Sequence, residues 1–266
     1  MGSKPIRKRF LALKPAESPR ERMDNPAARK PLNAFFPGSG RILFSVLFIT
    51  ALVILLIGYV DRPLALLARN LDPVINRFFS IVTRFGKSTT YLVGFGMAFT
   101  LLYPASRSDR WRDHAPALRR YALITFFIFV SIAASGLLVD ILKAVFGRYR
   151  PVMLYRKGLY GFTFFNLLRA RLHSFPSGHA NTVAALTAAL YFIKPRYALF
   201  YLPTALLVMA SRVIIGEHFI SDVIAGATLG IITTCYIKSY FEYHQIGIFF
   251  PASGREKHPP TLKSSS

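Results

Sequence analysis

The feature that most constrains this chain is a series of long apolar stretches without charged residues. Residues 42–60 form a run of 19 amino acids that carries no charge. A helix of about 20 apolar residues is long enough to cross the roughly 30 Å hydrocarbon core of a bilayer. Further stretches, some shorter or interrupted, lie at residues 88–106, 121–142, 177–194, 197–215 and 219–237. We therefore expect an all-α, polytopic membrane protein built as a six-transmembrane-helix bundle.

The two ends of the chain lie outside these stretches. Residues 1–40 mix Lys, Arg, Pro and small polar residues, which predicts a disordered basic cytoplasmic tail. The first apolar run starts too late and is too long for a cleavable signal peptide. We expect a membrane domain over residues 41–240 and a second cytoplasmic tail over residues 241–266.

The segment between the first two apolar stretches contains two features. Asp61-Arg62-Pro63 is predicted to break the first helix. Asp72-Pro73 then resembles an N-cap followed by proline at the first helical position. The apolar residues that follow recur at helical spacing, which predicts an amphipathic helix lying in the membrane interface. These residues are Val74, Ile75, Phe78, Phe79 and Val82. We interpret this helix as packed in the interface, with a lid or a path for substrate as the alternative.

The charge distribution indicates topology rather than nucleic-acid binding. The formal net charge is +22, but the sequence contains no recognisable nucleic-acid-binding module. Ten Lys and Arg residues precede the first apolar run, counting Arg41, and residues 107–120 add five. Placing both segments inside gives a cytoplasmic N-terminus and C-terminus. Residues 61–87 and 143–171 carry five and seven positive charges on the opposite side. The single cysteine, Cys235, excludes an intrachain disulfide framework and a cysteine-based zinc site.

Three polar segments adjoin the apolar stretches, at residues 143–151, 175–179 and 211–222. The six-helix topology places all three on the outer side of the membrane. Lys143, Arg150 and Arg212 supply positive charge, and the planar fork of arginine matches the oxygens of phosphate. Pro176-Ser177-Gly178 opens a helix, where free backbone N–H groups favour an anion. Together these segments predict a phosphate site.

Two histidines are candidates for the chemistry. His218 and Asp222 are four residues apart and share a helix face if the last helix has begun by residue 218. A carboxylate that holds one ring N–H leaves the other nitrogen free to attack phosphorus. His179 is then a candidate proton donor to the leaving group. The spacing alone does not decide which histidine attacks. Asp140, three residues before Lys143, is interpreted as its ion-pair partner and not as a catalytic residue.

The ordered pattern Lys-x6-Arg-Pro, Pro-Ser-Gly-His and Ser-Arg-x5-His-x3-Asp resembles the type-2 phosphatidic acid phosphatase superfamily, the lipid phosphate phosphatases. The pattern runs without a missing position from Lys143 to Asp222. The resemblance implies a hydrolase of lipid phosphomonoesters or pyrophosphates that needs no metal or other cofactor. It implies a phosphohistidine at His218, with Asp222 orienting that ring and His179 as general acid. The phosphate would be bound by Lys143, Arg150, Ser177, Gly178 and Arg212.

The resemblance also implies a phosphorylated membrane lipid as substrate. The size of the chain and its minimal loops favour the bacterial members of the family, so we expect a bacterial inner membrane, where the six-helix topology makes the site face the periplasm. Candidate substrates are phosphatidic acid, phosphatidylglycerophosphate, polyprenyl pyrophosphate and lipid A. The aromatic and basic residues between 152 and 175 either select the head group or form an interfacial belt. Vanadate-dependent haloperoxidases share the motifs but are soluble, so the apolar stretches argue against that alternative. A lipid or anion transporter is the second alternative, and it would distribute charges through the membrane depth rather than at one side.

Overall fold

The computed structural model describes residues 39–165, 173–244 and 246–248. Within these residues all regular secondary structure is helical, apart from one isolated antiparallel bridge between Arg148 and Phe162. This confirms the all-α prediction. Residues 1–38 and 249–266, which hold most of the predicted tails, lie outside the described residues, and the domain division stays a prediction.

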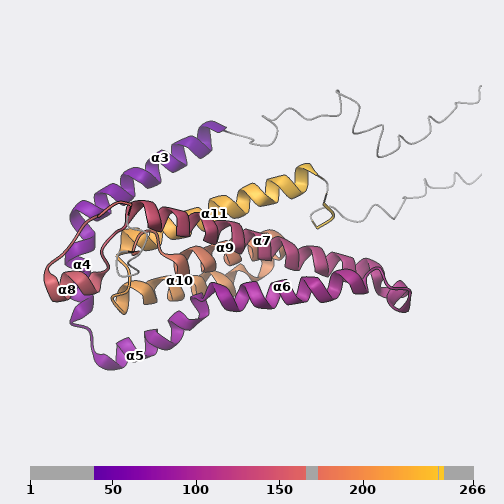
Figure 1. The fold of residues 1–266 in the computed structure, drawn as a ribbon, viewed down its shortest axis with the longest axis horizontal. Helices are drawn as coiled ribbons and strands as arrows, with labels where there is room; N and C mark the ends of the chain where they lie inside the picture. The colour runs from indigo at the N-terminus through magenta and orange to yellow at the C-terminus, as the bar shows by residue number, and fades with distance from the viewer. Residues whose placement is uncertain (1–38, 166–172, 245, 249–266) are drawn as a thin grey trace, which may run out of the picture. The chain divides into compact units, whose positions relative to one another are not determined.

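The helices, drawn in Figure 1, are α3 (Ser39–Leu55), η1 (Leu56–Val60), α4 (Asp61–Arg69), α5 (Pro73–Val82), η2 (Thr83–Gly86), α6 (Ser88–Ala105), η3 (Asp109–His114), α7 (Ala115–Phe146), α8 (Pro151–Lys157), α9 (Gly178–Ile193), η5 (Pro195–Tyr197), α10 (Ala198–Ile214) and α11 (Ile220–Tyr243).

In the described part of the chain, four helical segments are long and apolar enough to cross a membrane: Leu43–Arg69, Asp109–Phe146, Pro195–Ile214 and Ile220–Tyr243. The chain is an integral membrane protein. The other two predicted spans correspond to α6 and α9. Helix α9 has only 16 residues, and α6 begins with Ser88-Thr89-Thr90 and contains Pro104. The presence of six transmembrane helices therefore stays a prediction.

The first span differs from the expectation at Asp61. Helix α3 does not end there but passes through the π-helical turn η1 into α4, which continues to Arg69. The predicted break was wrong because Pro63 falls in the first turn of α4, where the missing N–H and the fixed φ of proline are tolerated. The carbonyl of Ile57, within this π turn, accepts a hydrogen bond from the hydroxyl of Tyr160 at 2.6 Å.

The predicted amphipathic helix is present as α5. Asp72 caps it, since its carboxylate accepts from the N–H of Val74 at 2.6 Å, and Pro73 follows at the first helical position. Val74 and Phe78 expose 75% and 54% of their surface, whereas Val82 packs against the buried cluster formed with α9 and α10. One end of the helix is therefore anchored in the bundle.

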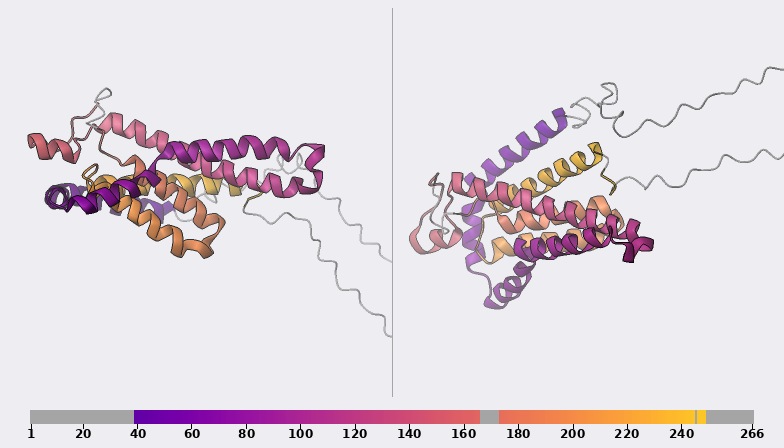
Figure 2. Two further views of the ribbon diagram at one scale, coloured as in Figure 1. Left: turned by 90° about the horizontal axis from the view of Figure 1, so that it is seen from below. Right: turned by 45° about the vertical axis from the view of Figure 1, so that its right-hand side comes forward.

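Helices α9 and α11 pack closely at the centre of the bundle, where α7 also contacts both (Figures 1 and 2). Two glycines of α11 permit this approach. A Cβ at Gly226 would lie 2.3 Å from the carbonyl oxygen of Ser177, and one at Gly230 would lie 2.4 Å from that of Asn181. Phe127, Ala185 and Phe241 form part of the apolar core beside this contact. The close packing fixes the start of α9 against the first turns of α11, where the predicted site residues lie.

Candidate active site

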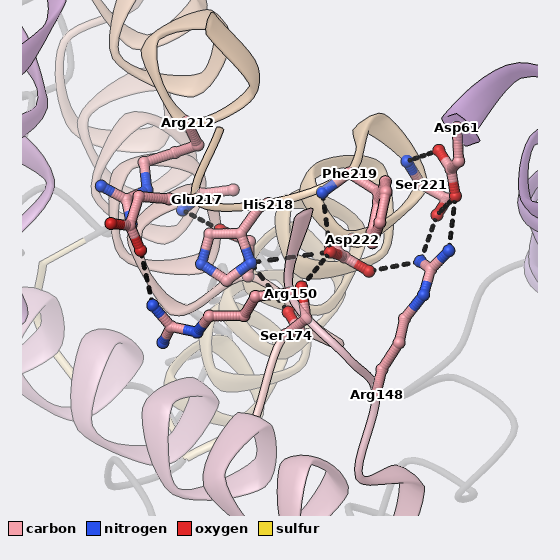
Figure 3. A network of polar contacts seen from close by, with 12 residues as sticks. Asp61, Arg148, Arg150, Ser174, Arg212, Glu217, His218, Phe219, Ser221 and Asp222 are labelled. Atoms are coloured by element: carbon pink, nitrogen blue, oxygen red, sulfur yellow. Dashed lines mark hydrogen bonds and ion pairs between the residues drawn. The ribbon is translucent and has the colours of Figure 1, made fainter. Parts of the chain in front are cut away.

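The imidazole of His218 is held through one nitrogen. Its Nδ1 lies 2.8 Å from the backbone carbonyl oxygen of Ser174 and 3.6 Å from Oδ2 of Asp222. Because both neighbours are acceptors, Nδ1 carries the proton in the neutral ring, and the lone pair is on Nε2. Nε2 points away from Asp222, toward the side where Arg150, Glu217 and Arg212 lie (Figure 3). The ring is therefore oriented as a nucleophile requires.

His218 and Asp222 meet in a different way from the one predicted. Helix α11 begins at Ile220, so His218 precedes it and shares no helix face with Asp222. Instead Asp222 caps the helix, since its Oδ2 accepts from the N–H of Phe219 at 2.9 Å. The same oxygen accepts from the hydroxyl of Ser174 at 2.6 Å. The cap places the carboxylate beside the imidazole.

A buried arginine holds the other oxygen of Asp222. Arg148 Nη1 donates to Asp222 Oδ1 at 2.5 Å and to Ser221 Oγ at 2.7 Å, and its Nη2 donates to Asp61 Oδ2 at 2.7 Å (Figure 3). The guanidinium also lies 4.5 Å from the ring centre of Phe219. The side chains of Arg148, Asp61 and Asp222 have no exposed surface. Two carboxylates and one guanidinium thus form a buried network that holds the carboxylate of Asp222 in place.

Two further arginines flank His218 on the side of Nε2. Arg150 Nη1 donates to Glu217 Oε2 at 2.5 Å, and Arg212 Nη2 lies 3.8 Å from the same oxygen. Arg212 also donates to the hydroxyl of Thr83 at 2.6 Å. The Nε groups of both arginines are buried and have no hydrogen-bond partner within the described part of the chain. Buried donors of this kind need an acceptor, which a phosphate oxygen would supply.

The start of α9 lies beside the predicted lysine. Ser177 is the N-cap, and its hydroxyl accepts from the N–H of Ala180 at 3.5 Å, which confirms the predicted helix start. The backbone N–H of Ser177 donates to the carbonyl of Asp222 at 2.9 Å. A Cβ at Gly178 would lie 3.1 Å from Nζ of Lys143, so the ammonium group reaches this helix terminus. Lys143 also pairs with Asp140 at 3.1 Å, as predicted.

The second histidine packs against η2. A Cβ at Gly86 would lie 2.7 Å from Cδ2 of His179, so the ring rests directly on that glycine. The same 3-10 turn supplies Thr83, the partner of Arg212. The segment after the amphipathic helix therefore contacts two of the predicted site residues.

Burial lowers the pKa of His218 below its usual value. The hydrogen bond and the charge of Asp222 oppose this shift, and the positive charges of Arg212 and Arg150 add to it. A lowered pKa keeps Nε2 unprotonated at neutral pH, as a nucleophile requires.

Sequence reasoning missed Asp61, Ser174 and Ser221 as parts of this site, and it gave no role to Arg148 and Glu217, which lie inside the first and third motifs. Asp61 carried a usable signal, because an acidic residue directly after an apolar membrane stretch is costly without a partner. Ser174 carried no signal, since its contribution to His218 is a backbone carbonyl.

Comparisons with known proteins agree with the motifs. The sequence profile of the PAP2 superfamily matches residues 124–246, which contain every predicted site residue. This segment of the chain is therefore similar to the PAP2 superfamily. Asp61, Thr83 and Gly86 lie outside the PAP2 segment, although the structure places them at the same site.

Two relatives illustrate the range of sequence similarity to known proteins. A lipid A 1-phosphatase of Rhizobium etli is 40% identical over 104 residues, which cover 39% of this chain and 44% of that protein. A lipid A 4'-phosphatase of Porphyromonas gingivalis is 26% identical over 197 residues, covering 69% of this chain and 74% of that protein. The chain thus spans less than half the length of the Rhizobium relative. A solved PAP2-type phosphatidylglycerolphosphate phosphatase of Bacillus subtilis covers 74% of this chain and 94% of its own, at 21% identity and a TM-score of 0.48.

Proposed function

We propose that this chain is a membrane phosphatase that removes phosphate from a phosphorylated lipid through a phosphohistidine at His218. The observation that carries the proposal is the orientation of that ring. Its Nδ1 faces Ser174 O and Asp222, and its Nε2 points to the side of two arginines (Figure 3). The site would face outward, as the distribution of positive charge predicts, and in a bacterial inner membrane this side is the periplasm.

The proposed reaction has two steps. In the first, Nε2 of His218 attacks phosphorus, the bond from phosphorus to the lipid oxygen breaks, and His179 gives a proton to the departing alkoxide. In the second, His179 takes a proton from water, whose oxygen attacks phosphorus and displaces His218. The products are the dephosphorylated lipid and inorganic phosphate.

The remaining predicted residues would bind the phosphoryl oxygens. Arg150 and Arg212 offer buried N–H donors, and Lys143 lies at the N-terminus of α9 beside Ser177 and Gly178. Donors fixed before the reaction stabilise charge that develops in the transition state. Asp222 would keep the Nδ1 proton in place and stabilise the positive charge that forms on the ring.

The carboxylates of the site support a mechanism without metal. Asp61 and Asp222 are paired with Arg148, and Glu217 is paired with Arg150. Two-metal phosphatase sites instead need several carboxylates directed at the ions. The names of the relatives place lipid A among the first substrates to test, beside phosphatidic acid, phosphatidylglycerophosphate and polyprenyl pyrophosphate.

The test is phosphate release by the purified protein across these four lipids in excess EDTA, with His218→Ala as the control. We expect release from at least one lipid by the wild type and none by the variant. Loss of activity in EDTA that Mg²⁺ or Zn²⁺ restores would count against the mechanism. Equal release by the variant would remove His218 from it.

A further inference from the structure

An apolar groove of about 270 Å³ runs between α9 and α10, with η2 and the start of α6 along one side. Its floor consists of the buried residues Val183, Ala205 and Val208, whereas Phe85 and Phe200 at the rim expose 63% and 73% of their surface. The groove is therefore open to the surroundings of the bundle along one side.

The groove begins directly beside the proposed phosphate site, on three separate elements. On α10, Val208 lies one turn before Arg212, and on α9, Val183 lies one turn after His179. In η2, Phe85 follows two residues after Thr83, which binds Arg212. Each element thus contributes a residue to the site and a residue to the groove.

The polar groups along the groove are largely satisfied by the backbone. The hydroxyl of Tyr91 donates to the carbonyl of Phe85 at 2.6 Å, and that of Thr204 donates to the carbonyl of Phe200 at 2.8 Å. The hydroxyl of Tyr201 donates to the carbonyl of Lys194 at 3.3 Å. The lining therefore offers an apolar surface to an occupant.

The far end of the groove lies about one membrane leaflet away from the phosphate site. This end is lined by Leu190 on α9 and Phe200 on α10. Leu190 lies 11 residues beyond His179, and Phe200 lies 12 residues before Arg212. At 1.5 Å per residue these separations are about 16 to 18 Å. This distance is close to half of the roughly 30 Å hydrocarbon core, the depth that the chains of one leaflet occupy.

We infer that this groove binds a hydrocarbon chain of the lipid whose phosphate occupies the site above it. The inference rests on the proposed function and adds how the substrate is held: the phosphate is bound by the arginines, and a chain lies along α9 and α10. The open side lets the lipid enter laterally from the bilayer. In the groove the hydrocarbon chain contacts Val183, Ala205 and Val208 instead of other lipids. These contacts hold the lipid in one position and so orient its phosphate toward His218.

The first test fills the groove. Thr187 lines it and is half-buried, so Thr187→Trp places an indole where the chain would lie. Thr100→Trp on α6 is the matched control, because Thr100 is exposed and outside the groove. Each variant is assayed on long-chain phosphatidic acid in mixed micelles and on p-nitrophenyl phosphate, which has no chain.

We expect Thr187→Trp to lower kcat/KM on the long-chain substrate by about tenfold or more and to keep that on p-nitrophenyl phosphate within about twofold. Thr100→Trp should leave both values near the wild type. Equal losses of Thr187→Trp on the two substrates, or no loss on the long-chain substrate, would overturn the inference.

The second test does not depend on turnover. Wild-type protein is irradiated with phosphatidic acid that carries a diazirine at the end of one chain, and adducts are located by peptide mass spectrometry. We expect adducts on Leu190 and Phe200 and their loss in Thr187→Trp. Adducts spread equally over the lipid-exposed faces of α3 and α6 would contradict the groove. Adducts in the groove without phosphate release from any lipid would overturn the proposed function but support lipid binding in the groove. Phosphate release with adducts elsewhere would support the proposed function but overturn lipid binding in the groove.

Discussion

Arg148 and Asp61 form an ion pair, with Nη2 and Oδ2 2.7 Å apart, in which neither side chain is exposed. Asp61 starts α4, and Arg148 lies in the loop after α7. The same guanidinium binds Asp222, whose other carboxylate oxygen lies 3.6 Å from Nδ1 of His218. The first helical span is thereby joined to the proposed nucleophile by two buried ion pairs.

The first prediction concerns the stability that this pair contributes. Asp61→Ala leaves Arg148 with one carboxylate instead of two and removes the acceptor of the Ser221 N–H, which donates to Oδ1 at 3.0 Å. Removing one partner of a buried ion pair costs about 3–5 kcal/mol. We therefore expect a clear drop in the midpoint of thermal unfolding of the purified protein in detergent.

The control for this prediction is Asp140→Ala. Asp140 is also paired, with Lys143, but its side chain is 73% exposed. Exposed ion pairs contribute little to stability, so the midpoint should change slightly. Equal midpoints for Asp61→Ala and the wild type would show that the buried network is not needed for folding.

The second prediction concerns the contact between α11 and the start of α9. Gly226→Ala would place a methyl group 2.3 Å from the carbonyl oxygen of Ser177, so the two helices must separate. We expect losses of both thermal stability and phosphate release. Gly94→Ala is the matched control, because a Cβ there meets no atom within 4 Å. The alanine should be neutral or stabilising by up to about 1 kcal/mol, since it is the better helix former. Similar effects of the two substitutions would refute the close contact.

The third prediction concerns the titration of His218. Burial lowers the pKa of this imidazole, so its midpoint should fall below about 6.5, the value of an unperturbed histidine. As the pH falls, the unfolded chain takes up this proton first, so the folded state loses stability below about pH 6.5. The midpoint can be measured by ¹⁵N NMR on histidine-labelled protein, with the signal assigned through His218→Gln. A midpoint above 6.5 would contradict the neutral ring.

The fourth prediction concerns orientation in the membrane. After replacement of Cys235, a cysteine at Leu159 should react with an impermeant maleimide in intact cells, because the site is proposed to face outward. Leu159 is 39% exposed and lies in the loop after α8. A cysteine at Arg110, in η3, should react only after the cells are permeabilised. The reverse pattern would place the site on the cytoplasmic side.

Sequence reasoning predicted the helices closely where apolar length determines them. The stretches at 177–194 and 197–215 became α9 (Gly178–Ile193) and α10 (Ala198–Ile214), and Asp72 caps α5 as expected. Length and capping are local properties, so they can be read from a short segment of sequence. The break at Asp61 was wrong because a π turn and a proline in the first turn let the helix continue.

The network behind the nucleophile could not be predicted in the same way. Asp61 and Arg148 are 87 residues apart, and Arg148 and Asp222 are 74 apart. Their contacts depend on the packing of three separate elements, which apolar periodicity does not specify. The contact of the Ser174 carbonyl with His218 could not be predicted either, because every residue type has a backbone carbonyl.

The central claim is that His218 attacks phosphorus and His179 transfers the proton. Rapid-quench trapping with radiolabelled lipid phosphate tests it directly. We predict that the wild type and His179→Ala form an acid-labile, base-stable phosphohistidine, with His179→Ala slower by about 10²–10⁴-fold in turnover. His218→Ala should form none. An adduct that persists in His218→Ala and disappears in His179→Ala would exchange the two roles, and the absence of any adduct in the wild type would favour direct attack by water.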